Sequence, residues 1–227
     1  MEKLKTFYTK YRHAMVSIIY MTIYLLWFAY LEQKNTKHYQ VIHMGIDDYI
    51  PFCEIFIVPY LFWFVYMTGI VIYFLFTNKT DYWKACAFLY TGMTVFLVVS
   101  TLWPNGHHLR LAVMPRDNIF TQMVEALWRT DTATNLWPSI HVYNSLGAHF
   151  AIINSKQFGH RKGVRFASLL ICSSIILATV FLKQHSMFDV LTAFVMAAIM
   201  YTLVYRYDIV LLLRKAFNKP KTEPLAG

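Results

Sequence analysis

Six long apolar stretches constrain the fold of this chain more than any other feature of its sequence. A helix needs roughly 20 mostly apolar residues to cross the hydrocarbon core of a membrane. The fourth stretch is shorter than the rest and contains Asn144 and His149, which indicates that it faces the interior of a bundle. The sequence predicts an all-α integral membrane protein: one domain over residues 1–227, forming a bundle of six transmembrane helices. The predicted spans are 14–31, about 55–76, about 85–102, 139–153, 166–182 and 190–213.

The composition agrees with a membrane protein. Of the 227 residues, 57% are hydrophobic and only 15% are charged, whereas soluble domains carry about 25% charged residues. This excludes a disordered chain, and the 8 Gly and 7 Pro exclude a collagen-like one. Cys53, Cys86 and Cys172 form no CxxC pair, so we expect no disulfide framework and no metal site from them.

The distribution of basic residues predicts the orientation of the bundle. With the six spans drawn, 15 of the 21 Lys and Arg residues fall on one side of the membrane. This side holds the N-terminal segment, the loops 78–84 and 154–165, the basic tail 214–227, and Arg206 near the end of the last span. Basic loops stay in the cytoplasm, so both termini are predicted to be cytoplasmic and the first span to be a retained anchor in the cell membrane. The net charge of +9 is thereby explained without a nucleic-acid partner.

Three polar patches meet at the opposite, outer face in this topology. The first lies around Arg110, the second is the sequence PSIH at 138–141, and the third is KQHSMFD at 183–189. They belong to the core region 104–190 and are far apart in the sequence. Because the spans alternate in direction, we expect the three patches to lie within reach of one another.

The residue types in these patches suit a phosphate. Pro138 fits the first turn of a helix, whose free N–H groups and dipole form an anion site. Ser139 adds a hydroxyl donor, and His141 exchanges a proton near neutral pH. Arg110 offers a bidentate guanidinium and Lys183 a point charge. Together these groups predict a site that holds phosphoryl oxygens.

His185 and Asp189 are spaced i, i+4, which places them on one face of a helix. The Asp189 carboxylate then accepts a hydrogen bond from one ring nitrogen of His185 and leaves the other nitrogen free as a nucleophile. This pair predicts nucleophilic catalysis.

The sequences PSIH and KQHSMFD, with their histidines 44 residues apart, resemble the type 2 phosphatidic acid phosphatase superfamily of membrane lipid phosphatases and phosphotransferases. The stretch IDDYIPF before the second span is similar to the subgroup that contains inositol phosphorylceramide synthases and bacterial relatives. Two positions differ from the family pattern. Leu111 stands where a proline usually follows the arginine of the first motif, and Lys183 stands in place of the arginine of the third.

The resemblance implies a role for each residue and no metal or other cofactor. His185 would attack phosphorus and form a phosphohistidine, with Asp189 orienting it. His141 would protonate the leaving oxygen. The phosphate would be bound by Arg110, Ser139 and Lys183.

The expected function is hydrolysis of a lipid phosphate, such as phosphatidate, phosphatidylglycerophosphate or a polyprenyl diphosphate. One alternative is transfer of a phospho-headgroup to a second lipid, and another is a non-catalytic binding or transport subunit. The sequence does not specify the lipid or the oligomeric state. For His107 and His108, a loop near the lipid headgroups is favoured over a metal site. Asp47 and Asp48 could line the mouth of the site or lie on a solvated face.

Overall fold

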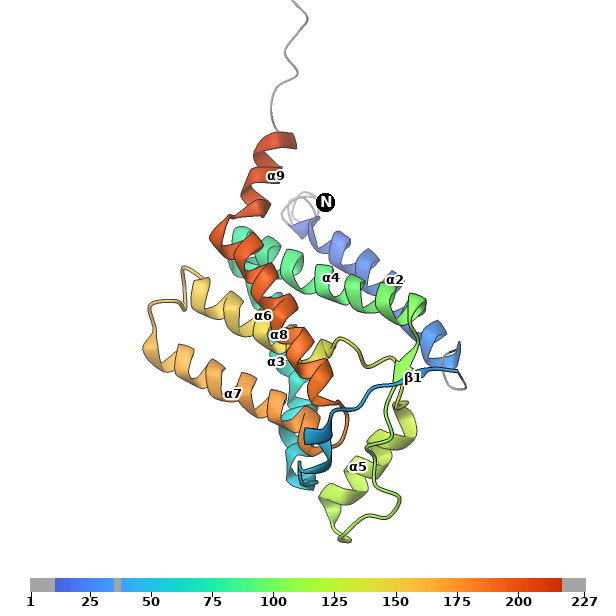
Figure 1. Cartoon of the computed structure of the whole chain (residues 1–227). Coiled ribbons are helices and arrows are strands. Elements are labelled where there is room, and N and C mark those ends of the chain that lie inside the picture. The colour runs from blue at the N-terminus through green and yellow to red at the C-terminus, as the bar shows by residue number, and fades with distance from the viewer. Residues whose placement is uncertain (1–10, 35–37, 218–227) are drawn as a thin grey trace, which may run out of the picture.

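The computed structural model describes residues 11–34 and 38–217 and shows an almost entirely helical chain (Figure 1). The prediction of an all-α fold is confirmed, because this part of the chain contains eight α-helices and only two short strands. The elements are α2 (Ala14–Lys34), β1 (Gln40–Val41), η1 (Gly45–Asp48), η2 (Glu54–Phe56), α3 (Ile57–Thr77), α4 (Lys79–Leu102), β2 (Asn105–Gly106), α5 (Ile119–Thr130), α6 (Ile140–Asn154), α7 (Lys162–Phe181), α8 (Met187–Tyr201), η3 (Thr202–Arg206) and α9 (Ile209–Phe217).

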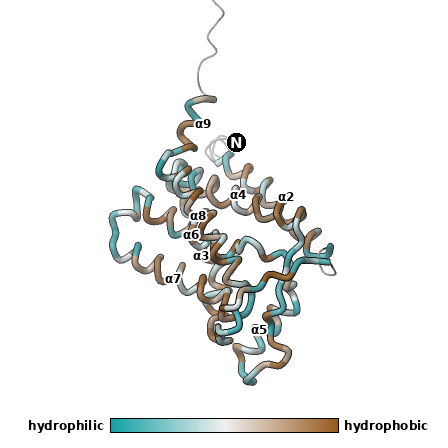
Figure 2. The backbone as a smooth tube through the Cα atoms, viewed as in Figure 1, coloured by the Kyte–Doolittle hydropathy of each residue, from teal (hydrophilic) through white to brown (hydrophobic). Residues whose placement is uncertain are grey.

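Five helical segments within the described residues are long and apolar enough to cross a membrane, judged by length and composition. Figure 2 shows hydrophobic residues concentrated along these helices and hydrophilic ones along many of the connections. The predicted span at 139–153 corresponds to α6, which at 15 residues is shorter than the other five. The five segments are Ala14–Lys34, Glu54–Thr77, Lys79–Leu102, Lys162–Phe181 and Met187–Arg206.

Helix α6 is the centre of the bundle. It packs against α3, α4, α7 and α8, and ten of its 15 residues are buried. The Tyr143 ring lies directly over Gly92 of α4, where an added Cβ would overlap it, and the Tyr143 hydroxyl donates to the carbonyl oxygen of Phe88 at 2.8 Å. His149 lies 2.8 Å from the Ser168 hydroxyl of α7. Close packing and interhelical hydrogen bonds therefore position this short helix.

The prediction of one continuous helix over 190–213 is wrong. Helix α8 begins earlier, at Met187, and the chain turns at Asp208, whose φ is 49°. The carboxylate of Asp208 accepts the Leu211 N–H and forms an ion pair with Lys84 at 2.7 Å. Asp208 therefore caps a new helix, α9, and fixes its start against α4.

The long connection 103–138 is ordered. Its first residues form β2, which pairs in parallel with β1, and its middle part forms α5. The side chain of Asn118 caps α5 by accepting the N–H groups of Phe120 and Thr121. Many of the basic residues used for orientation, at 3, 5, 10, 219 and 221, lie outside the described residues.

Candidate active site

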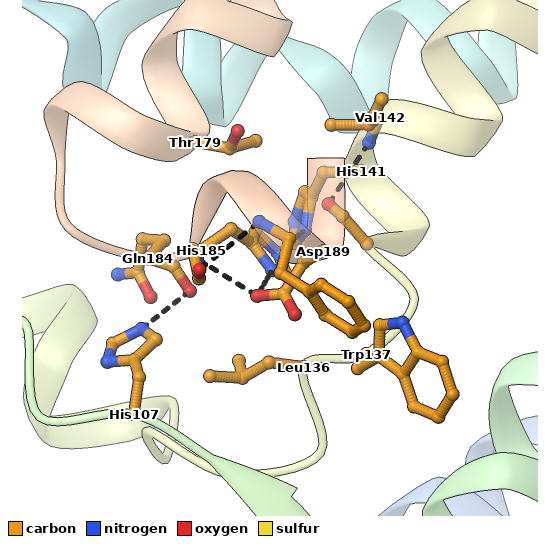
Figure 3. A network of polar contacts seen from close by, with 12 residues as sticks. His107, Leu136, Trp137, His141, Val142, Thr179, Gln184, His185 and Asp189 are labelled. Carbon is orange, nitrogen blue, oxygen red and sulfur yellow. Dashed lines mark hydrogen bonds and ion pairs between the residues drawn. The ribbon is translucent and has the colours of Figure 1, made fainter. Parts of the chain in front are cut away.

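His141, His185 and Asp189 come together where α6 and α8 begin (Figure 3). His185 lies between the other two: its Nδ1 is 3.4 Å from Asp189 Oδ2, and its Nε2 is 3.4 Å from His141 Nδ1. His185 is only 4% exposed. Burial, together with the nearby Arg110 charge, lowers the pKa of His185 to about 3. The ring is therefore neutral at neutral pH, as a nitrogen nucleophile must be.

The predicted contact between His185 and Asp189 is present, but the two residues do not share a face of a helix as the i, i+4 spacing suggested. His185 precedes α8 and does not lie on a helical face, since the helix is capped by Ser186. The Asp189 carboxylate accepts the Ser186 N–H at 2.9 Å through its Oδ2, which forms a capping box. This box folds the turn back so that His185 reaches the same oxygen. The other oxygen, Oδ1, is buried without a hydrogen-bond partner among the described residues.

The expectation that Pro138 opens the fourth helix is also wrong. Helix α6 begins at Ile140 and is capped by Ser139, so Pro138 precedes the cap. The buried Ser139 hydroxyl accepts the Val142 N–H at 3.4 Å. The Ser139 N–H donates to the carbonyl oxygen of Asp189 at 3.3 Å. Ser139 therefore joins the starts of α6 and α8 in this structure.

Arg110 lies beside the site, and its terminal nitrogens already have protein partners. They donate to the carbonyl oxygens of Trp128, Asp131 and Thr132 at 2.8–3.1 Å and to Gln184 Oε1 at 2.9 Å. The Nε–H of Arg110 is buried without a partner in the part of the chain that is described. Arg110 thus holds the segment after α5 against the residue that precedes His185.

The ammonium group of Lys183 contacts the segment around η1. Its Nζ donates to the carbonyl oxygens of Asp47 at 2.9 Å and Ile50 at 2.5 Å. The residue is 7% exposed, and burial lowers its pKa from the ordinary value. Two of its three N–H donors are therefore occupied by the backbone.

Asp47 is a site residue whose importance the sequence analysis missed. It is 1% exposed, and its carboxylate accepts the Ser186 hydroxyl at 2.6 Å and the Met187 N–H at 2.8 Å. It also accepts the N–H of Met44 at 2.8 Å. By contrast, Asp48 is exposed and pairs with His43. Two adjacent aspartates in a polar segment give no signal to separate these roles, because the difference comes from the register of η1 against α8.

His107 is buried, contrary to the expectation of a loop among headgroups, whereas His108 is exposed. The Nδ1 of His107 accepts the Leu109 N–H at 3.2 Å, so its Nε2–H donates to the carbonyl oxygen of Gln184 at 2.9 Å. Burial lowers the pKa of His107 to about 4. A neutral His107 thus holds the backbone directly before His185 (Figure 3).

An apolar cavity of about 390 Å³ is lined by both His141 and His185. Leu25 and Phe64 also line this cavity and are each 56% exposed, so it opens to the outside between α2 and α3. The further apolar and aromatic lining residues are Tyr24, Phe28, Tyr60, Trp63, Phe96, Leu127, Leu136 and Ile140. The polar ones are Thr130, Asp131, Thr134, Asn135 and Gln184.

Two aromatic rings fix His141 in the wall of this cavity. The ring centroids of Tyr60 and Trp63, both on α3, lie 4.7 and 4.5 Å from that of His141. The cavity therefore brings apolar surface from the outside of the bundle to a pair of imidazoles.

The described residues contain no cluster of three or more His, Cys, Asp or Glu side chains placed to hold a metal ion. Cys53, Cys86 and Cys172 are free thiols. Comparisons with known proteins find no matching family model, no similar curated protein and no similar solved structure.

Proposed function

We propose that the protein is a membrane lipid-phosphate phosphatase that hydrolyses a phosphomonoester or diphosphate of an amphiphilic lipid through a phosphohistidine. The observation that carries this proposal is the row Asp189, His185 and His141, whose two histidines line an apolar cavity between apolar helices. The cavity offers room for an alkyl chain, and the imidazoles offer a nucleophile and a proton donor for its polar end.

In the first step, Nε2 of His185 attacks phosphorus. An N–P bond forms, the P–O bond to the lipid breaks, and His141, as the imidazolium that a neighbouring phosphate dianion favours, gives its proton to the leaving oxygen and becomes neutral. Asp189 accepts the Nδ1–H of His185, which keeps the attacking nitrogen free and stabilises the positive charge that develops on the ring.

In the second step, water attacks the phosphohistidine and the N–P bond breaks. His141, which lost its proton in the first step, takes one from this water. Inorganic phosphate leaves, and both histidines return to their starting protonation states. If a lipid hydroxyl replaces the water, the same chemistry becomes transfer of the phospho-group.

The substrate has to part the two histidines. An attacking nitrogen lies about 3–3.5 Å from phosphorus, and a proton donor lies about 2.6–3.2 Å from the leaving oxygen beyond it. His185 Nε2 and His141 Nδ1 are only 3.4 Å apart, so phosphorus and the leaving oxygen cannot both lie between them. We therefore expect one ring to rotate when a phosphate enters.

The phosphate is proposed to be bound by Arg110, Ser139 and Lys183, with phosphate oxygens replacing some of their present hydrogen-bond partners in the protein. Among the described residues, these three retain the Nε–H of Arg110, the third N–H of Lys183 and the O–H of Ser139, whose oxygen accepts the Val142 N–H, as donors for a ligand. A phosphate that approaches His185 would first accept hydrogen bonds from these free donors. It would then take the place of a backbone carbonyl oxygen as the acceptor of a further N–H group.

We propose that six segments cross the cell membrane, α6 being the fourth, with both chain ends in the cytoplasm and the histidines toward the outer surface. The basic residues on one side support this orientation. The start of α2 and helix α9 lie at one end of the bundle, and α5 lies at the other (Figure 1).

The test is phosphate release by the purified full-length protein in detergent micelles, with EDTA present, from phosphatidate, phosphatidylglycerophosphate and polyprenyl diphosphate. His185→Ala is compared with His108→Ala, which removes an exposed histidine of the neighbouring loop. We expect release that persists in EDTA, survives His108→Ala and falls at least about 1,000-fold in His185→Ala.

Folded wild-type protein that releases no phosphate from any of these lipids would refute the hydrolase. An added lipid with a free hydroxyl distinguishes the alternatives in that case. Phospho-group transfer to it that requires His185 would identify a phosphotransferase. Saturable lipid binding without any turnover, equal in wild type and His185→Ala, would identify a binding protein.

A further inference from the structure

A second pocket lies at the opposite end of the bundle from the histidines, where α2 and α4 begin and α9 passes over them. It is open, has a volume of about 440 Å³, and is lined by Arg12, His13, Lys79, Trp83 and Arg214, with Met15 and Val16. Its polar residues come from the turn directly before α2, the first turns of α4, and α9, which are far apart in the sequence.

The three strongly basic residues of this pocket have no acidic partner among the residues that the structure describes. Arg12, Lys79 and Arg214 are exposed, and none forms an ion pair within the described ranges 11–34 and 38–217. Of the nearby carboxylates, Asp208 is paired with Lys84, and Asp81 does not line the pocket. Three unneutralised cations from three separate segments repel one another and favour an anionic ligand.

His13 provides an independent observation. It is 7% exposed, and both of its ring nitrogens are buried with no hydrogen-bond partner among the described residues. Its ring contacts the edge of the Tyr82 ring, with centroids 5.1 Å apart. Buried polar atoms are nearly always paired, so this wall of the pocket lacks a group that would accept or donate a hydrogen bond.

The position of Arg214 is fixed by other contacts. The ion pair between Lys84 and Asp208 holds the start of α9 against α4 at 2.7 Å. The Asp208 carboxylate also accepts the Leu211 N–H at the start of α9. Arg214 reaches the pocket because α9 starts at this anchored point.

Apolar surface adjoins the pocket. Met15, Val16, Ile18 and Ile19 of α2 are 45–64% exposed, and so are Leu212 and Leu213 of α9. Basic pockets flanked by apolar helices at a membrane surface suit the headgroup of an anionic lipid, whose acyl chains then cover the apolar surface.

We propose that this pocket binds the phosphate of an anionic phospholipid from the membrane leaflet opposite to the candidate active site. Arg12, Lys79 and Arg214 bind the phosphate oxygens, and the acyl chains lie against the exposed side chains of α2. Such a lipid ties α9 to α2, an element that α9 does not otherwise pack against extensively.

The experiment measures lipid binding to the full-length protein in neutral detergent by native mass spectrometry and by the change in Tm. The probes are phosphatidylglycerol, phosphatidylcholine and inorganic phosphate. We compare wild type with the double variant Arg12→Gln/Arg214→Gln. The control Lys162→Gln/Arg165→Gln removes two exposed charges from α7, which does not line the pocket.

We expect phosphatidylglycerol to be retained and to raise Tm, and phosphatidylcholine to do neither. A basic residue near an anionic surface contributes about fivefold in affinity, so the double variant should bind phosphatidylglycerol about 25-fold more weakly, and the control should bind as wild type does. Equal loss in both variants would overturn the proposal, because net charge alone would then explain binding. Binding of inorganic phosphate as tight as that of phosphatidylglycerol would overturn the lipid as the source of the phosphate.

Discussion

Removal of the Asp47 carboxylate tests the inference that the segment around η1 holds His185, the proposed nucleophile, in place. Asp47 accepts hydrogen bonds from the Ser186 hydroxyl, the Met187 N–H and the Met44 N–H at 2.6–2.8 Å. Two of these donors lie at the N-terminus of α8, directly after His185. A negative charge there also interacts favourably with the helix dipole.

The magnitude follows from the donors that Asp47→Ala would leave behind. The Ser186 hydroxyl can rotate to another acceptor, but the two backbone N–H groups cannot. A buried donor without a partner costs about 1–3 kcal/mol, so we expect Asp47→Ala to lower the free energy of unfolding by about 4 kcal/mol. For a chain of this size that corresponds to a fall in Tm of about 8–16 °C. Asp47→Asn keeps one acceptor oxygen and should cost about half as much.

The assay is thermal unfolding in detergent, followed by phosphate release at a temperature at which both proteins are folded. Asp48→Ala is the matched control, since Asp48 is exposed and pairs with the exposed His43; its cost should stay within about 0.5 kcal/mol. We expect Asp47→Asn to lower kcat more than it raises KM, because it displaces His185 without touching the cavity. If Asp47→Ala is as stable as Asp48→Ala and fully active, the reasoning is refuted.

Three further predictions concern the same site. Because the pKa of His107 is about 4 in the folded state and about 6.5 in the unfolded state, the unfolded state binds an extra proton at pH values between these two. The free energy of unfolding should therefore fall as the pH drops from 6.5 to 4. Denaturation curves at several pH values should show that His107→Gln removes about 3 kcal/mol of this pH dependence. Arg110→Lys replaces four hydrogen bonds by at most three, and chemical denaturation should show a loss of about 2 kcal/mol; unchanged stability would contradict a structural role for the guanidinium. Phe64→Trp narrows the mouth of the cavity, so KM should rise for long-chain lipid phosphates and stay constant for a short-chain analogue, whereas an equal rise for both would place the entry elsewhere.

The helical fold was predictable, because long apolar stretches leave the backbone few alternatives to helices in a membrane. The predictions that were wrong concern the positions at which helices begin and end. The break at Asp208 could not be read from hydropathy, since apolar residues continue on both sides of it. The start of α6 was misplaced because Pro138 is compatible both with the first turn and with the residue before a Ser139 cap. Side-chain capping, which depends on one polar atom, decides such ends.

The sequence analysis selected the residues that meet at the site but not the partners of the cations. Arg110 and Lys183 were expected to face a phosphate because each is basic and lies near a histidine. In the structure both donate mainly to backbone carbonyl oxygens of other segments. A charged side chain that is withdrawn from water takes whichever acceptors the fold supplies, and carbonyl positions are set by tertiary packing that no sequence pattern encodes.

The contacts around His185 extend the candidate site to segments that contain neither the PSIH nor the KQHSMFD sequence. Lys183 precedes His185 by two residues and Ser186 follows it, and both bind Asp47, one through its carbonyl oxygen and the other through its carboxylate. His107 holds the Gln184 carbonyl from a third segment. The turn that carries His185, the proposed nucleophile, is thus fixed from both sides by residues outside the two motifs with histidines. Since a misplacement of about 1 Å can cost 100-fold in rate, substitutions in η1 should affect turnover although none of its side chains lines the cavity.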